Sequence, residues 1–255
     1  MMPHTGKRPR RPYHEAMTAS RVFQVGLMSA LLAGVYDGPT PLREVLRHGD
    51  LGLGTFNGLD GEMILVDGVC YRMRSDGSID LPSPDERTPF AVVTRFTASA
   101  SASIDEPVDR AGLIERVRSM VPSENYLYAV QVHGRFESVV TRTVQRQEPP
   151  YRPMREAVRD QSVLEFRSIS GTIAGFRTPL YERGIGVPGG HVHFIDDERH
   201  RGGHVLDFRM LSGSVEVCVA TELDLRLPLD DGFRDADLEP PELTEDLAAT
   251  EGPTA

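Results

Sequence analysis

The sequence predicts a β-rich α+β fold with a few helices, and three observations support this class. Short β-prone segments make up most of the chain, and turns such as Asn57-Gly58 and Asp67-Gly68 separate them. Only three segments have apolar residues at helical spacing. The chain has 255 residues, of which 39% are hydrophobic, so it can bury one large core or two small ones.

The first half of the chain is predicted to combine short helices with hairpin strands. Residues 1–20 lack apolar periodicity, so we predict a disordered basic arm. Gln24–Tyr36 is predicted to be a helix, because its apolar residues recur every three or four positions. A short amphipathic helix is expected over Pro41–His48. Hairpin strands are expected over Leu51–Tyr71, and a further strand over Pro89–Ser99.

The second half is predicted to be mostly strands after one helix over Asp109–Ser119. Tyr126–Val144 is predicted to form two strands that turn at His133-Gly134. Gln147–Pro153 contains three prolines in seven residues and indicates a linker. Four strands are expected beyond this linker, near residues 163–177, 185–195, 203–209 and 214–226.

The linker and the composition divide the chain beyond the basic arm into three parts. We predict an N-terminal α/β domain over residues 21–146 and a C-terminal β domain over residues 147–228. The last part, residues 229–255, holds nine acidic residues against one basic residue, Arg234. It therefore forms an acidic tail.

Charge and cysteine content exclude several classes of protein. The net charge is −10, and without the tail 27 basic residues stand against 29 acidic ones. Sequence-independent nucleic-acid binding needs a basic surface, so no nucleic-acid partner is expected. The longest apolar stretch has about a dozen residues whereas a membrane span needs roughly 20, so no membrane partner is expected. Two distant cysteines encode no disulfide framework, and a cytoplasmic protein is expected.

Four of the eight histidines fall within fourteen residues, and three of them have the spacing of a metal site. His191 and His193 are two residues apart, so on a strand both side chains leave the same face. A hairpin centred between residues 198 and 199 places His204 opposite His193 and diagonal to His191. Three imidazoles at these separations can bind one metal ion about 2.0–2.1 Å from each nitrogen. His200 falls in the hairpin loop and is not an expected ligand.

Three nitrogen ligands with an open fourth position are typical of a catalytic zinc site. Nickel, copper or iron bind the same donors, and spacing alone does not choose among them. Surface histidines that bind nothing and titrate near neutral pH are the alternative interpretation.

Several separate motifs follow one another along the chain in one order. Gly189-Gly190-His191-Val192-His193-Phe194-Ile195-Asp196-Asp197-Glu198, followed by Gly202-Gly203-His204-Val205-Leu206-Asp207, resembles the histidine segment of the α-acetolactate decarboxylase family. Leu53-Gly54-Thr55-Phe56-Asn57-Gly58-Leu59-Asp60-Gly61-Glu62-Met63 is similar to its N-terminal signature. Phe136-Glu137-Ser138-Val139-Val140-Thr141-Arg142-Thr143 resembles its central arginine strand. Only the arm before residue 20 and the detailed sequence of the acidic tail fall outside the resemblance.

The resemblance implies a two-domain protein with mixed β-sheet and β-barrel-like elements, often dimeric, that converts 2-acetolactate to acetoin and CO₂. It implies zinc on His191, His193 and His204. By the same motifs Glu62 and Arg142 line the substrate site, and Thr55 lies beside it. The family also returns a C-terminal glutamate to the metal. Glu251 matches that pattern best, and Glu242 and Glu245 compete with it.

The chemistry of a β-keto acid explains these residue types. Loss of CO₂ leaves an electron pair that delocalises onto the ketone, and a Lewis acid stabilises that charge. Arg142 alternates with Phe136, Ser138, Val140 and Val144, which predicts one mostly apolar face and a buried guanidinium that needs a carboxylate partner. That partner is the substrate carboxylate or Glu62, and an inter-strand brace is the structural alternative. Glu62 follows a tight turn and is either a solvated carboxylate or the group that holds the proton for the enolate.

Two other functions compete with decarboxylation. His191-x-His193-x₄-Glu198 also resembles part of the cupin pattern, which implies a metal-dependent dioxygenase or isomerase. Against it, the third histidine follows His193 by only eleven residues and Glu198 falls in the loop. A non-catalytic module that binds a small molecule on the same β-core is the second alternative.

Overall fold

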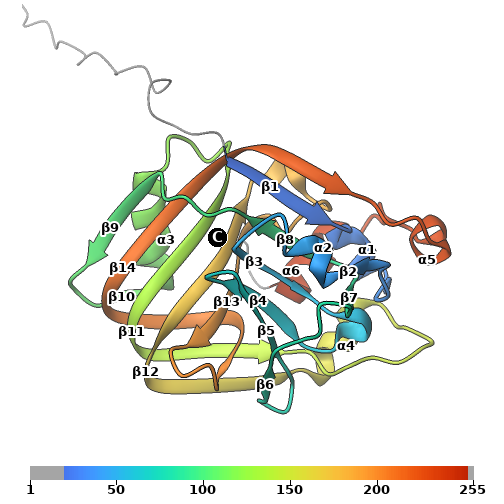
Figure 1. The fold of residues 1–255 in the computed structure, drawn as a ribbon, viewed down its shortest axis with the longest axis horizontal. Helices are drawn as coiled ribbons and strands as arrows, with labels where there is room; N and C mark the ends of the chain where they lie inside the picture. Colours follow the sequence, from blue (N-terminus) through green and yellow to red (C-terminus); the bar gives the residue numbers. More distant parts are fainter. Residues whose placement is uncertain (1–19, 252–255) are drawn as a thin grey trace, which may run out of the picture.

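The structure, a computed structural model, describes residues 20–251 and is dominated by β-strands (Figure 1). The strands are β1 (Ser20–Val25), β2 (Thr40–Pro41), β3 (Leu51–Thr55), β4 (Glu62–Val66), β5 (Val69–Met73), β6 (Ile79–Asp80), β7 (Arg87–Thr88), β8 (Ala91–Thr94), β9 (Ala100–Ile104), β10 (Val108–Asp109), β11 (Leu127–Thr143), β12 (Ser162–Thr178), β13 (Gly189–Asp196) and β14 (Gly202–Arg226). The α-helices are α1 (Met28–Leu32), α2 (Leu42–Val45), α3 (Arg110–Met120), α4 (Met154–Ala157), α5 (Asp231–Asp235) and α6 (Leu243–Glu251). The predicted β-rich class with few helices is confirmed.

Twelve of the described strands form one sheet in the order β11-β12-β13-β14-β1-β8-β3-β4-β5-β6, with β9 and β10 also paired to β14. Because β11 pairs with both β12 and β14, the four strands β11–β14 close into a small barrel. The parallel pair β1–β14 joins the barrel to the remaining strands. The predicted barrel-like element is therefore present, and the boundary at residues 147–153 falls in the loop between β11 and α4. The division into residues 21–146 and 147–228 stays a prediction.

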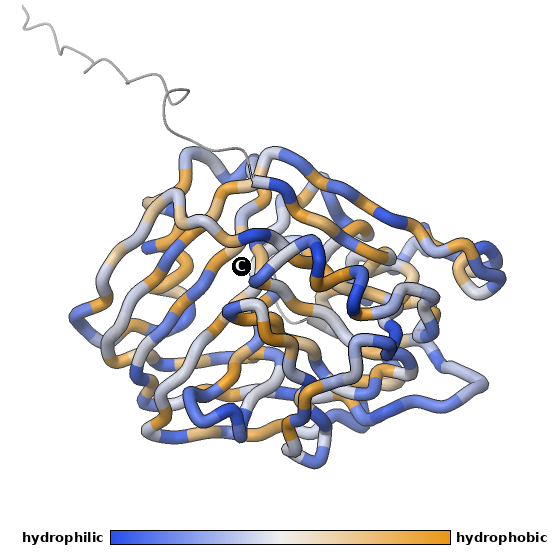
Figure 2. The backbone as a smooth tube through the Cα atoms, in the orientation of Figure 1, coloured by the Kyte–Doolittle hydropathy of each residue, from blue (hydrophilic) through white to orange (hydrophobic). Residues whose placement is uncertain are grey.

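Apolar side chains divide between the inside of the barrel and the space beside it. One core contains side chains from all four barrel strands and from α3, and Phe136 there makes edge contacts with Phe194 and Phe208. A second core joins α1, β3, β4, α4 and α6 to the outer side of the barrel. Figure 2 shows the resulting alternation of hydrophobic and hydrophilic positions along the long strands. Side chains on the outer face of β13 and at the start of β14 therefore point toward the second core, whereas Asp207 and Arg209 farther along β14 are exposed.

The predicted helix over Gln24–Tyr36 is wrong in its first part. The chain continues as β1 to Val25, hydrogen-bonded to β8 and β14, and only the five residues of α1 are α-helical. All five are buried, so the apolar spacing reflects burial on every side and not one amphipathic face. Gly26 separates the two elements with φ +72°, and a Cβ there would stand 2.0 Å from the carbonyl oxygen of Pro89. The helices predicted over Pro41–His48 and Asp109–Ser119 are present as α2 and α3.

Two predicted turns lie inside continuous strands. β11 runs through His133-Gly134, and β14 joins the strands predicted near 203–209 and 214–226. Gly134 lies opposite Gly213, where the two strands approach closely, and a Cβ on Gly134 would lie 2.2 Å from the carbonyl oxygen of Ser212. Glycine at residue 134 therefore serves a close backbone approach and not a reversal of the chain.

Replacing Gly134 by Ala is expected to lower the free energy of unfolding by about 1–3 kcal/mol, because backbone atoms on β14 must move. Gly190→Ala is the matched control, since nothing lies within 4 Å of its added Cβ. That control should be neutral or slightly stabilising. Urea unfolding measures both variants, and equal stability of the two would contradict the close-approach argument.

Candidate metal centre

Three histidines on adjacent barrel strands meet on the outer face of the barrel. His193 lies directly opposite His204 in the β13–β14 ladder, as the hairpin register predicted. Val192 and Phe194 alternate with the histidines and contribute to the core inside the barrel. His191 and His193 consequently point away from that core, toward β3, β4 and α1.

The imidazole nitrogens are close enough to share one ion. One ligand nitrogen from each of His191, His193 and His204 lies within 4.8 Å of the other two, and the ring centroids are 5.1–5.5 Å apart. His193 is 0% exposed and His204 is 4% exposed. Among the described residues 20–250, this is the one group of three histidine, cysteine or acidic side chains with such convergence. The alternative of separate surface histidines does not fit this burial.

His193 is oriented by the strand that carries Glu62. Its Nδ1 donates a hydrogen bond to the backbone carbonyl of Met63, 2.8 Å away. Its Nε2 then faces the other two histidines and lies 3.5 Å from a carboxylate oxygen of Glu62. A carbonyl that accepts from one ring nitrogen fixes the tautomer and leaves the other nitrogen for a metal. The tautomer follows from this contact.

Burial keeps His191 and His204 neutral. Desolvation, aided by the positive charge of Arg142, lowers the pKa of His191 to about 3. The pKa of His204 is lowered well below its usual range by the same two causes, by the neighbouring histidines and, least, by the charge of Arg110. Both rings are therefore unprotonated at neutral pH, the state in which imidazole nitrogen binds metals.

Arg142 lies beside this group on the neighbouring strand β11. It pairs with His204 across the ladder, is 5% exposed, and donates from Nη2 to Nε2 of His204 at 3.5 Å. Its Nη1 donates to Gln161 Oε1 at 3.3 Å. The single apolar face predicted for residues 136–144 is wrong, because register shifts between 135 and 141 place Phe136 inside the barrel and Val144 in the outer core.

Glu62 and Thr55 form the opposite wall and face each other across the β3–β4 ladder. The Thr55 hydroxyl donates to the carbonyl of Gly61 at 2.9 Å, which holds the turn before Glu62. The Glu62 side chain is 16% exposed, so it is not the solvated carboxylate of an open turn. Arg72 braces the same turn through ion pairs with Asp60, Asp80 and Glu86.

The two walls enclose one cavity that contains both polar and apolar side chains. Thr55, Glu62, Arg142, His191 and His204 all line it. The apolar part comes from α1, the start of α4 and the segments that follow β3, precede β8 and follow β11, through Met28, Leu31, Leu59, Phe90, Val144 and Met154. Sequence reasoning missed this apolar wall and also Gln161. No local pattern marks these residues, because only long-range packing brings them to the site.

The acidic tail returns to this region as α6, which packs against α1 and α4 (Figure 1). Leu247 and Thr250 of α6 are buried, whereas Glu242 and Glu245 are exposed. Glu251 is the last residue of α6, and its side chain lies outside the described part of the chain. The predicted basic arm at residues 1–20 falls, apart from Ser20, outside the described residues. Within residues 20–251 no helix has both the length and the apolar character needed to cross a bilayer.

Comparison with known proteins identifies the family. The family model described as "Alpha-acetolactate decarboxylase" matches residues 22–240. The alpha-acetolactate decarboxylase of Bacillus subtilis strain 168 is 44% identical over 91% of this chain and 91% of its own length. That of Raoultella terrigena is 44% identical over 91% of this chain and 90% of its own length. The crystal structure of the Bacillus subtilis strain 168 protein superposes with a TM-score of 0.90 and 44% identity, covering 92% of this chain and all of that one. The chain therefore belongs to the alpha-acetolactate decarboxylase family and is a carboxy-lyase.

Proposed function

We propose that this protein converts 2-acetolactate to acetoin and CO₂ with zinc held by His191, His193 and His204. The observation that carries the proposal is one buried cavity in which neutral imidazoles stand next to a guanidinium and a carboxylate. A 2-hydroxy-3-keto acid offers matching groups, namely a carboxylate, a ketone and a hydroxyl. Membership in the alpha-acetolactate decarboxylase family supports acetolactate as the substrate.

The donor set fits zinc. Three convergent imidazole nitrogens, one of them oriented by a backbone carbonyl, match the ligands of catalytic zinc sites with one open position. When bound, the ion supplies Lewis-acid stabilisation for the negative charge that develops as CO₂ leaves. The same donors accept nickel, copper or iron, so metal analysis of the purified protein is part of the test.

The side chains of the cavity have separate roles in the proposal. Arg142 binds the substrate carboxylate with its buried guanidinium. This contact fixes the orientation of the C1–C2 bond that is cleaved. Cleavage of the C1–C2 bond releases CO₂ and leaves its electron pair on C2, delocalised onto the C3 ketone. Glu62 holds the proton that is then delivered to C2, which balances the reaction. Delivery from one fixed side of the cavity makes the acetoin chiral, and Thr55 keeps the turn that carries Glu62 in position.

Several finer features belong to the same proposal. In this proposal Glu251 is the C-terminal glutamate that approaches the metal. Residue 251 follows the buried Leu247 by one helical turn, whereas the competing Glu242 and Glu245 are exposed. We also propose that the protein is a homodimer located in the cytoplasm. It has no nucleic-acid or membrane partner in this proposal. Light scattering of the purified protein measures the oligomeric state.

A colorimetric acetoin assay tests the function. The zinc-loaded protein should form acetoin from racemic acetolactate, lose this activity with a chelator and regain it with added zinc. Oxygen consumption is recorded in parallel, because a cupin-like dioxygenase would consume oxygen. Retention of acetolactate without any product would instead support a non-catalytic binding module.

Replacing Glu62 by Gln is expected to lower kcat about 10²-fold with zinc content unchanged, because the amide cannot supply the proton. The acetoin that forms should lose enantiomeric purity. Glu137→Gln is the matched control, since that carboxylate is exposed and pairs with Arg209. Full turnover in zinc-loaded Glu62→Gln would remove this residue from the mechanism.

The metal-free protein is expected to lose stability as pH falls below about 6.5. The pKa of His191 is about 3 in the folded chain, so between these values the unfolded chain binds more protons. Urea unfolding across this pH range measures the effect. His191→Gln should flatten the pH dependence, whereas His200→Gln in the exposed hairpin turn should leave it unchanged. Equal slopes in all three proteins would contradict the pKa assignment.

A further inference from the structure

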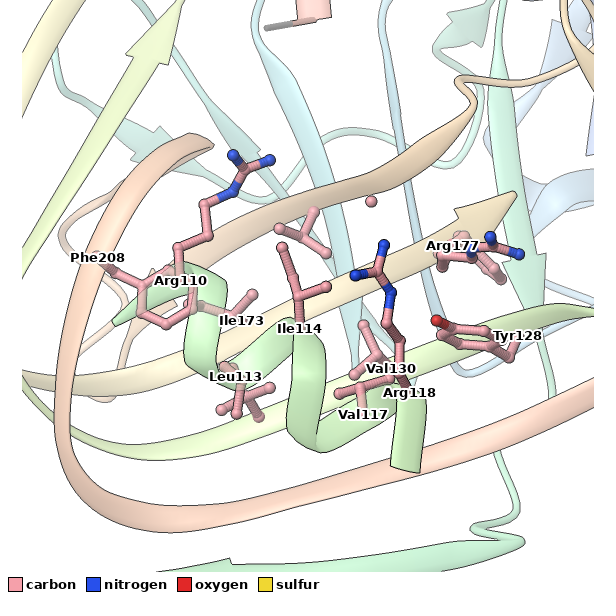
Figure 3. Close-up of a pocket in the computed structure, with 14 residues that line it drawn as sticks. Arg110, Leu113, Ile114, Val117, Arg118, Tyr128, Val130, Ile173, Arg177 and Phe208 are labelled. Atoms are coloured by element: carbon pink, nitrogen blue, oxygen red, sulfur yellow. The ribbon is translucent and has the colours of Figure 1, made fainter. Parts of the chain in front are cut away.

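A second cavity lies on the other side of the histidine strand, between α3 and the inner face of the barrel (Figure 3). Val192, which separates the two β13 histidines in sequence, is part of its lining. The two cavities have no lining residue in common. This chamber is therefore distinct from the candidate metal centre, although one strand separates the two.

The chamber is lined mainly by apolar side chains. Leu113 and Val117 of α3 form one wall, and Val130, Ile173 and Val192 of the barrel strands form another. Its volume is about 80 Å³. This is smaller than the ~150 Å³ cavity that admits benzene and larger than the ~10–15 Å³ of cavity volume that one enclosed water needs, so a short alkyl group of about three or four carbons fits.

Three guanidinium groups from Arg110, Arg118 and Arg177 border this apolar space (Figure 3). Arg118 binds the carboxylates of Glu115 and Glu124, and Arg177 binds the carbonyl and the carboxylate of Glu124. These two arginines are neutralised locally.

Arg110 differs from the other two. It forms no ion pair within residues 20–250, and no acidic residue lies in the first turn of α3. The neighbouring Asp109 accepts the backbone N–H of Gly112 as the helix cap and does not line the chamber. The chamber thus combines an apolar interior with one available cation at its border.

We propose that this chamber binds a short-chain aliphatic carboxylate, with the alkyl group among the valine and leucine side chains and the carboxylate on Arg110. Charge complementarity selects an anion over a neutral molecule of the same shape. The volume of the chamber matches an alkyl chain of the length found in pentanoate. This proposal does not depend on the reaction proposed for the metal centre.

Isothermal titration of the zinc-loaded protein with pentanoate tests the proposal, with 1-pentanol as the neutral probe. Arg110→Met should weaken pentanoate binding about 10- to 100-fold, the cost of losing a hydrogen bond to a charged group. Ile114→Phe, which adds volume at the lining, should weaken both probes. Arg116→Met is the matched control, because this arginine is exposed on the same helix and does not line the chamber.

The substrate cavity also offers a guanidinium, so the titration is repeated in Arg142→Met. Binding that persists in Arg142→Met and weakens in Arg110→Met supports the chamber. No binding to the wild-type protein would overturn the proposal, as would loss of binding in Arg142→Met alone. Equal binding of pentanol and pentanoate, insensitive to Arg110→Met, would overturn the assignment of a carboxylate.

Discussion

Replacing His193 by Gln is expected to remove the bound zinc and to lower kcat/KM for acetolactate by at least about 10³-fold. Lewis-acid stabilisation of a developing charge is worth several kcal/mol, and about 4 kcal/mol corresponds to this factor. His193 is the most buried of the three histidines, and its Nδ1 bond to Met63 directs Nε2 at the other two rings. An amide side chain cannot present a second nitrogen in that direction while it keeps this bond.

Metal analysis and single-substrate kinetics measure the effect, and His200→Gln is the control. His200 lies in the same hairpin, but its side chain is 76% exposed, so activity and zinc content should stay at the wild-type level. Wild-type activity in His193→Gln, with or without zinc, would contradict the proposed centre. A misfolded variant is recognised by urea unfolding, and His191→Gln then serves as the second variant.

The histidine site could be predicted from sequence because its geometry is local. One polar hairpin loop fixes the register that places His193 against His204, and strand alternation places His191 on the same face. Strand alternation also predicts that Val192 and Phe194 point the other way, into the barrel. Nothing outside fourteen residues of sequence is needed for this arrangement.

The surroundings of the site could not be predicted, because they depend on contacts between distant segments. The parallel pairing of β1 with β14 brings α1 to the cavity, and no local pattern marks it. The continuity of β11 was missed because Gly134 resembles a turn residue until its neighbour Gly213 is known. The register shifts that follow Gly134 then place Arg142 on the opposite face of β11 from Phe136.

Replacing Arg142 by Met is expected to lower kcat/KM for acetolactate about 10²-fold, mainly through a higher KM. Loss of a hydrogen-bonded contact between the guanidinium and a carboxylate costs about 1.5–3 kcal/mol, and the cavity then lacks a buried cation for the substrate. Arg142→Lys should recover part of this loss, because the charge returns without the planar fork. Arg135→Met, an exposed position on the same strand, should have wild-type kinetics.

Arg142→Met also tests whether Arg142 binds the substrate or serves only as a structural brace. The charge of Arg142 affects the histidines as well, which gives a second measurement. Its charge contributes to the lowered pKa of His191 and His204, so Arg142→Met should raise both values and make zinc retention more sensitive to acid. Zinc content after dialysis at decreasing pH measures this effect independently of activity. A brace alone predicts lower stability, no recovery by Lys and an unchanged KM for the remaining folded enzyme. That pattern would exclude Arg142 from the substrate site and leave the carboxylate of acetolactate to another group in the cavity.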